Sequence, residues 1–186
     1  MVNMPNSELR IIAGELKNQK YLSPNSSATH PMSEKLKNSI FNILGDIEGL
    51  SVLDAFSGSG GIGLEAASRG AKEVTLIESN INAQKTTNTN IRKLNLIKTV
   101  KLLRMSVQTW TSSELKKQFN IVIADPPYDN TDKSIISKLA EFTCPGGIFV
   151  LSLPATTQPY EMSNFKMISQ KTYGNSQLIF YQKPKP

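Results

Sequence analysis

The sequence predicts an α/β fold in which helices cover both faces of a mostly parallel β-sheet. Short apolar runs with strand character alternate with helical segments from residue 51 to residue 153. A glycine-rich turn follows the first of these runs, and the last two strand-like runs meet at Gly174-Asn175, a dipeptide typical of hairpins. Alternating strands and helices predict a doubly wound sheet, and the terminal hairpin adds an antiparallel edge.

The N-terminal part carries a separate pattern. Residues 8–22 contain two strand-like runs on either side of Gly14, which predicts a hairpin or an extended arm. Ser33 is a suitable N-cap for the helix that follows. The apolar residues of that helix fall on one face: Leu36, Ile40, Phe41 and Leu44.

The remaining elements follow from apolar runs and their spacing. Strands are predicted at 51–56, 73–79, 99–103, 120–125, 146–153, 165–173 and 177–183, and helices at 61–69, 80–94, 107–118 and 132–142. The strands predicted at 51–56 and 120–125 are mainly apolar, as expected for buried strands.

Length and composition are those of one folded domain. With 186 residues, 39% hydrophobic and 19% charged, the chain fits a single domain over 1–186, made of an N-terminal extension (8–44) and a core (51–186). No apolar run approaches the roughly 20 residues of a membrane span, and the first residues lack a secretion signal, so we expect a cytoplasmic protein without membrane contact. One cysteine and one histidine argue against a disulfide scaffold and against a zinc site.

The charge balance favours a polyanionic partner. The formal net charge is +6 and the pI is near 9.4, but no segment is a basic tail. A nucleic-acid surface would therefore be assembled by folding, from residues such as Arg10, Lys17, Lys20, Lys35, Lys37 and the C-terminal lysines. An ordinary basic surface explains the charge equally well.

The first core strand leads into a candidate cofactor site. Gly58, Gly60 and Gly63 have the G-x-G-x-x-G spacing of a turn that approaches a ligand closely, before a helix N-terminus. Glu78 ends the next strand, 20 residues after Gly58, where a carboxylate can accept both hydroxyls of an adenosine ribose. The pattern predicts a cofactor that contains adenosine. A glycine-rich turn without a ligand is the alternative.

Asp54 helps to distinguish between the possible adenosine-containing cofactors. A carboxylate directly before the glycines would repel the pyrophosphate of a nicotinamide cofactor, and the chain has little length for the usual second domain. It would suit a cofactor with an ammonium and a sulfonium group, which favours S-adenosylmethionine.

A second strand end carries the sequence DPPY. Asp125, Pro126, Pro127 and Tyr128 follow the apolar strand at the same edge of the sheet as the glycines. Proline has no N–H, so the Asp125 carboxylate and the Pro126 carbonyl remain as acceptors that could orient a planar exocyclic amine. Tyr128 could stack on the base that carries this amine. A simple proline turn is the alternative.

Together these motifs resemble a known family. The segments LRIIAGELKNQKYLSP, THPMSEKLKNSIFNIL, LDAFSGSGGIGLEAASRGA, IVIADPPY and YGNSQLIFY are similar to those of the bacterial 16S ribosomal RNA guanine-N2 methyltransferases, over about residues 9–182. The resemblance implies a Rossmann-like, seven-stranded class I methyltransferase fold. It also implies that the extension at 8–44 helps to hold RNA.

The resemblance implies the following site. Asp54, Phe56, Ser57, Gly58, Gly60 and Glu78 would bind S-adenosylmethionine, with Ser106 on its adenine side, and Asp125, Pro126, Pro127 and Tyr128 would hold the target guanine. Ser106 departs from the family pattern, in which an acidic residue is common at this position. The implied partner is 16S ribosomal RNA within a small subunit or its precursor, bound by a monomer, without a metal ion.

Three alternative functions remain open. A DNA adenine-N6 methyltransferase would use the same DPPY chemistry, although a separate target-recognition domain is not evident, and duplex oligonucleotide assays would reveal it. A noncatalytic RNA-binding protein would bind RNA equally well after Asp125→Ala. A nicotinamide oxidoreductase would be recognised by titration of the two cofactors.

Overall fold

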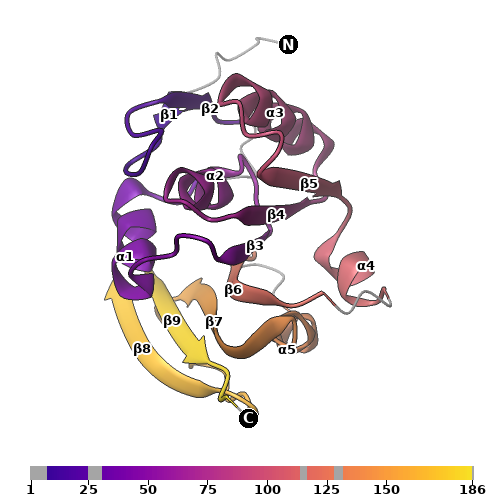
Figure 1. Ribbon diagram of the computed structural model, residues 1–186. Coiled ribbons are helices and arrows are strands. Elements are labelled where there is room, and N and C mark those ends of the chain that lie inside the picture. The colour runs from indigo at the N-terminus through magenta and orange to yellow at the C-terminus, as the bar shows by residue number, and fades with distance from the viewer. Residues whose placement is uncertain (1–7, 25–30, 114–116, 128–131, 186) are drawn as a thin grey trace.

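A seven-stranded β-sheet forms the centre of the computed structural model, which describes residues 8–24, 31–113, 117–127 and 132–185 (Figure 1). The strand order is β5-β4-β3-β6-β7-β9-β8. The strands are β3 (Ser51–Ala55), β4 (Glu73–Glu78), β5 (Val100–Arg104), β6 (Phe119–Ala124), β7 (Thr143–Pro154), β8 (Lys166–Tyr173) and β9 (Ser176–Gln182). The first five in this order are parallel, whereas β9 is antiparallel to both of its neighbours, β7 and β8. The predicted fold class is confirmed.

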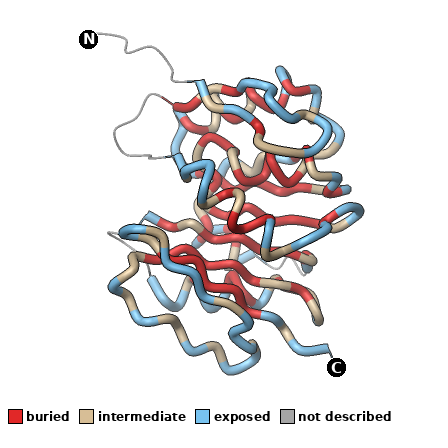
Figure 2. The backbone as a smooth tube through the Cα atoms, turned by 90° about the vertical axis from the view of Figure 1, so that its left-hand side faces the viewer, coloured by how far each residue is buried: buried red, intermediate tan, exposed pale blue. Residues whose placement is uncertain are grey.

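Helices cover both faces of the sheet. They are α1 (Glu34–Leu44), α2 (Gly61–Ser68), α3 (Ile81–Lys93), α4 (Val107–Thr111) and α5 (Lys133–Ala140). Apolar residues of α1, α2 and α3 share one core cluster with alternate strand residues such as Val52, and those of α4 and α5 share the other with residues such as Leu53. Buried backbone accordingly follows the central strands in Figure 2. None of the described helices is long and apolar enough to cross a membrane.

The N-terminal extension packs onto the first of these clusters. Strands β1 (Glu8–Arg10) and β2 (Lys20–Leu22) form an antiparallel hairpin that lies beside α3 (Figure 1). Ile11 and Tyr21 are buried in the same cluster as the sheet. The predicted hairpin and the N-cap of α1 by Ser33, whose hydroxyl accepts the N–H of Leu36 at 3.3 Å, are both confirmed.

One helix is shorter than predicted. The periodicity predicts a helix over 107–118, but α4 ends at Thr111 and Ser112 is its C-cap, while residues 114–116 of the predicted helix lie outside the described residues. The hydroxyls of Ser112 and Ser113 donate to the carbonyls of Gln108 and Trp110, at 2.9 and 2.6 Å. Serine side chains that bond backbone carbonyls in this way compete with continuation of the helix.

Candidate functional site

Three acidic side chains meet at the carboxyl edge of the sheet. Asp54 lies near the end of β3, Glu78 is the last residue of β4, and Asp125 directly follows β6. β3 is paired with both β4 and β6 in parallel, so these strand ends are neighbours. Such an edge is where doubly wound sheets bind their ligands.

Two of these carboxylates hold the glycine-rich loop between β3 and α2. The Asp54 Oδ2 atom accepts the N–H of Gly63 at 2.9 Å, and the Glu78 Oε2 atom accepts the N–H of Gly58 at 2.7 Å. Phe56 has a φ of 66°, a left-handed conformation that is costly for a residue with a side chain. The loop is therefore a strained turn that is anchored at both ends.

The glycines of the motif have different physical roles. A Cβ at Gly63 would lie 2.2 Å from the Cδ2 atom of Leu76, so this glycine permits close packing of α2 on β4. Gly58 has a φ of 54°, and a Cβ there would meet no atom within 4 Å. Open space beside a left-handed glycine is what a ligand that approaches the backbone requires.

Helix α3 supports the loop from its other side. The Thr87 hydroxyl donates to the Gly58 carbonyl at 2.7 Å, and the Asn90 amide donates to the Ser59 carbonyl at 3.2 Å. Asn90 also exchanges two hydrogen bonds with the backbone of Leu22 in β2. Sequence reasoning missed both side chains, because nothing in the polar pattern of α3 distinguishes them from their neighbours.

The end of β3 and the loop after it each contain one buried polar atom that is unsatisfied. Asp54 Oδ1 and Ser57 Oγ have no hydrogen-bond partner among the described residues. Burial, against the opposing hydrogen bond from Gly63 and with smaller contributions from the negative charges of Asp125 and Glu78, raises the pKa of Asp54 to about 8. A ligand with a positive charge and hydrogen-bond donors would satisfy these atoms. This donor and charge pattern fits S-adenosylmethionine, whose ammonium and sulfonium groups are both cationic.

The two residues predicted for the adenosine part lie at the same edge. Glu78 Oε1 accepts the N–H of Asn80 at 2.6 Å, so each oxygen of this carboxylate already has one backbone donor. An ionised carboxylate has about four acceptor positions, which leaves capacity for ribose hydroxyls. Ser106 is the N-cap of α4, just beyond β5, and its hydroxyl accepts the N–H of Thr109 at 3.0 Å. The cofactor contacts of both remain predictions.

Asp125 is half-buried and is held by a neighbouring strand. Burial raises the pKa of its carboxyl, while a hydrogen bond with the buried Ser152 of β7 opposes the rise. Pro126 is buried and Pro127 is exposed, whereas Tyr128 lies outside the described residues. Ser152 was missed because it is distant from Asp125 in sequence.

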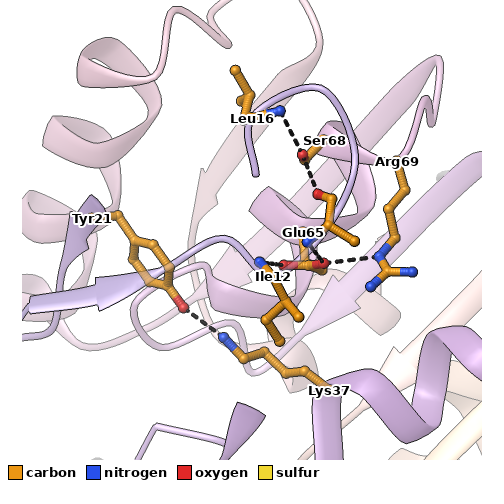
Figure 3. A network of polar contacts seen from close by, with 8 residues as sticks. Ile12, Leu16, Tyr21, Lys37, Glu65, Ser68 and Arg69 are labelled. Atoms are coloured by element: carbon orange, nitrogen blue, oxygen red, sulfur yellow. Dashed lines mark hydrogen bonds and ion pairs between the residues drawn. The ribbon is translucent and has the colours of Figure 1, made fainter. Parts of the chain in front are cut away.

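A buried acid attaches the N-terminal extension to α2 (Figure 3). Glu65 is fully buried, and its carboxylate accepts the N–H groups of Ile12 and Ala13, at 2.8 and 3.0 Å, and the Nε–H of Arg69 at 2.9 Å. Charge-assisted bonds of this kind are strong when buried. The extension is therefore fixed beside the glycine-rich loop.

The structure corrects the expected RNA surface. Lys37 is only 2% exposed and donates to the Tyr21 hydroxyl at 2.9 Å (Figure 3), so its assignment to a nucleic-acid surface is wrong. Arg10 and Lys20 are exposed but form ion pairs with Glu34 and Glu8, at 2.9 and 2.8 Å. Amphipathic spacing did not reveal that a lysine of α1 would face the core.

Sheets of this strand order, with a glycine-rich loop anchored by acidic side chains at the carboxyl edge, are those of the class I S-adenosylmethionine-dependent methyltransferases, and this chain has the fold of that class. Within the class, it belongs to the family described as Conserved hypothetical protein 95, whose model matches residues 9–182. The resemblance read from the sequence is confirmed.

Individual relatives cover nearly the whole chain. Ribosomal RNA small subunit methyltransferase D of Haemophilus influenzae is 29% identical, over 97% of this chain and 98% of its own. The Bacillus subtilis protein YlbH is 28% identical, over 94% and 99%. The solved structure of Escherichia coli yhhF superposes with a TM-score of 0.86 at 25% identity, over 97% and 100%. An RNA methyltransferase of Salinibacter ruber, solved with S-adenosyl-L-homocysteine, shares the fold, with a TM-score of 0.63 at 16% identity, over 84% and 95%.

Proposed function

We propose that this protein transfers a methyl group from S-adenosylmethionine to the exocyclic N2 amine of a guanine in 16S ribosomal RNA. The observation that carries the proposal is the position of Asp125, beside the two carboxylates of the cofactor loop and followed by two prolines. The names of relatives that are ribosomal RNA small subunit methyltransferases support RNA as the substrate.

The cofactor would be held by the loop between β3 and α2. Asp54 Oδ1, which is buried and unsatisfied, would accept from the cofactor's ammonium group, and Glu78 would accept from the ribose hydroxyls. When bound, S-adenosylmethionine supplies an electrophilic methyl group on a sulfonium ion. The three carboxylates make the site electronegative, which favours a cationic ligand over a pyrophosphate.

Asp125 would orient the amine for attack. Its carboxylate and the Pro126 carbonyl would accept the two N–H groups, which directs the nitrogen lone pair out of the plane of the base. Orientation of this kind can contribute about 7–11 kcal/mol to lowering a reaction barrier. The amine becomes acidic only once it is methylated, so Asp125 would act by hydrogen bonding and by stabilising the developing positive charge, and proton loss would follow.

Tyr128 would stack on the guanine, which must leave its base stack to reach the site. Extrusion of a base costs a few kcal/mol and is least costly in a loop or an unpaired segment. An unpaired guanine of the small subunit is therefore the expected target.

The test is transfer of labelled methyl to small subunits that lack the modification. Wild type should place label in N2-methylguanosine, and Asp125→Asn should reduce the rate at least about 100-fold, while S-adenosylhomocysteine affinity changes less than about threefold. Asp46→Asn makes the same chemical change at an exposed loop and should keep full activity. Label in adenine of duplex DNA, or none in RNA despite cofactor binding, would contradict the proposal.

A further inference from the structure

The positive charge of the chain is concentrated in one stretch. Residues 79–113 contain six basic residues and no acidic residue. The other fifteen basic residues are matched by fifteen acidic ones, so this stretch accounts for the whole formal net charge of +6. Six unopposed charges so close in sequence make a strong local positive potential.

This stretch forms one side of the molecule, from α3 through β5 to α4, where β5 is an edge strand of the sheet and lies next to α3 (Figure 1). All six basic residues are exposed: Lys85, Arg92, Lys93, Lys98, Lys101 and Arg104. None of them forms an ion pair with another described residue. Glu78 is opposite Arg104 in the strand register without forming an ion pair with it, and the pKa of Glu8 is lowered chiefly by its hydrogen bond with Lys20 and less by Lys93. We call this side the α3/β5 face.

The α3/β5 face differs from the basic residues of the N-terminal extension. In the N-terminal hairpin, Arg10 and Lys20 are neutralised by Glu34 and Glu8, and Lys37 of α1 is buried. A phosphate would have to displace a carboxylate from Arg10 or Lys20, whereas it meets free cations on the α3/β5 face.

The face is also hollowed. A cavity of about 140 Å³ lies between α3 and β5, lined by the polar side chains of Asn88, Arg92 and Arg104 and by apolar ones that include Ile97 and Leu102. Guanidinium groups bind phosphate oxygens with two parallel hydrogen bonds, and amides bind sugar hydroxyls or phosphates. Two arginines and an amide around an apolar floor suit a ribose–phosphate backbone better than a bare ion.

The α3/β5 face lies close enough to the proposed reaction site for one RNA strand to contact both. Arg104 ends β5 in register with Glu78 of β4, so the top of the cavity reaches the same edge as the cofactor site. β5 lies three strands from β6, which is roughly 14 Å at about 4.8 Å per strand. An RNA strand covers this distance in about four stacked nucleotides at roughly 3.4 Å each.

We propose that the α3/β5 face binds the sugar–phosphate backbone of the RNA that flanks the target guanine. This inference rests on the proposed function only in taking RNA as the substrate. Contacts of this type position a substrate without reading its sequence, and they release counterions. We therefore expect the affinity for RNA to fall with increasing salt concentration, and the basic residues of the face to contribute to this dependence.

The test removes two charges from the α3/β5 face and, as a control, two from the opposite edge of the sheet. Arg92→Gln with Arg104→Gln alters the face, and Lys166→Gln with Lys171→Gln is the matched control on the opposite edge strand β8, where both lysines are exposed. Affinity for 16S ribosomal RNA is measured over a range of salt. The logarithm of the binding constant falls linearly with the logarithm of the salt concentration. Each lost phosphate contact makes this negative slope shallower by about 0.7–0.9, so we expect its magnitude to decrease by about 1.4–1.8 for the arginine pair.

The control pair should change the slope by less than about 0.5 and leave the affinity within about threefold, whereas the arginine pair should weaken binding at least about tenfold at low salt. Lys85→Gln with Lys98→Gln, beside the same cavity, should also reduce the magnitude of the slope, so the inference does not depend on the arginine pair alone. Thermal unfolding establishes that each variant is folded. Equal effects of the face and control pairs, or no effect of either face pair, would overturn the inference.

Methyl transfer is measured separately on the same RNA. If the wild type binds RNA through this face but forms no N2-methylguanosine, the face stands and the proposed reaction fails. If methylguanosine forms while both face pairs bind as the wild type does, the reaction stands and the face is refuted.

Discussion

The protonation of Asp54 should govern cofactor binding. Burial and two neighbouring carboxylates raise the pKa of Asp54 to about 8 in the protein without cofactor, and only the ionised form attracts an ammonium group. At pH 6, two units below this pKa, about one molecule in 100 carries the ionised form, and at pH 8 about half do. Because affinity scales with the competent fraction, the Kd for S-adenosylhomocysteine should rise about 50-fold between pH 8 and pH 6.

The measurement is isothermal titration with S-adenosylhomocysteine at several pH values from 6 to 9. Asp54→Asn is nearly isosteric and removes the titrating group, so its affinity should be independent of pH and weaker than that of the wild type at pH 9. Asp125→Asn, whose pKa is also raised by burial, tests whether that carboxyl contributes to the same profile. A wild-type Kd that changes less than threefold from pH 6 to 8 would refute the reasoning, as would an unchanged profile in Asp54→Asn.

The same group links stability to pH. Its pKa in the folded protein lies above the ordinary value of 3.8, so the native state retains a proton that the unfolded chain releases. The free energy of unfolding should therefore fall as the pH rises from about 4 to about 8, by up to about 1.4 kcal/mol per unit from this group. Urea unfolding at pH 5 and pH 8 should show a smaller decrease in Asp54→Asn than in the wild type.

Three further predictions separate packing from ligand binding. Gly63→Ala should lower the free energy of unfolding by about 1–3 kcal/mol in urea titrations because its Cβ would overlap a side chain of β4, whereas Gly58→Ala should weaken S-adenosylhomocysteine binding more than it lowers stability. Glu65→Ala should cost about 3–5 kcal/mol by the same assay, because it leaves two part-buried backbone donors and the half-buried Arg69 without their partner, and a loss below 1 kcal/mol would contradict this. Ser152→Ala should shift the acidic limb of the pH–rate profile upward by about one unit, because it removes a hydrogen bond that favours ionised Asp125.

Much of the fold and of the site could be predicted from local pattern. Alternation of apolar runs with helices predicted the doubly wound sheet, because a strand buried on both faces must be almost wholly apolar. The spacing of Gly58, Gly60 and Gly63 after a strand predicted a loop that Asp54 and Glu78 do anchor. These features depend on residues close in sequence, or on the rule that parallel strand ends share one edge, so they need no knowledge of packing.

Other features depend on which side chains the fold brings together. The contact of Ser152 with Asp125, and the bridge that Asn90 makes between Leu22 and the glycine-rich loop, join elements that no short pattern connects. Lys37 has the sequence character of a surface lysine, yet it is buried against Tyr21.

Charge illustrates the division between sequence and tertiary structure. The sequence by itself determined that the chain is basic and that residues 79–113 lack acids. Only the tertiary structure decided that the lysines and arginines of this stretch form no ion pair with another described residue, while Arg10 and Lys20 elsewhere are neutralised. The reason is that an ion pair, a raised pKa or an unsatisfied oxygen depends on distances of a few ångströms and on exclusion of water, which the chain acquires only when it folds.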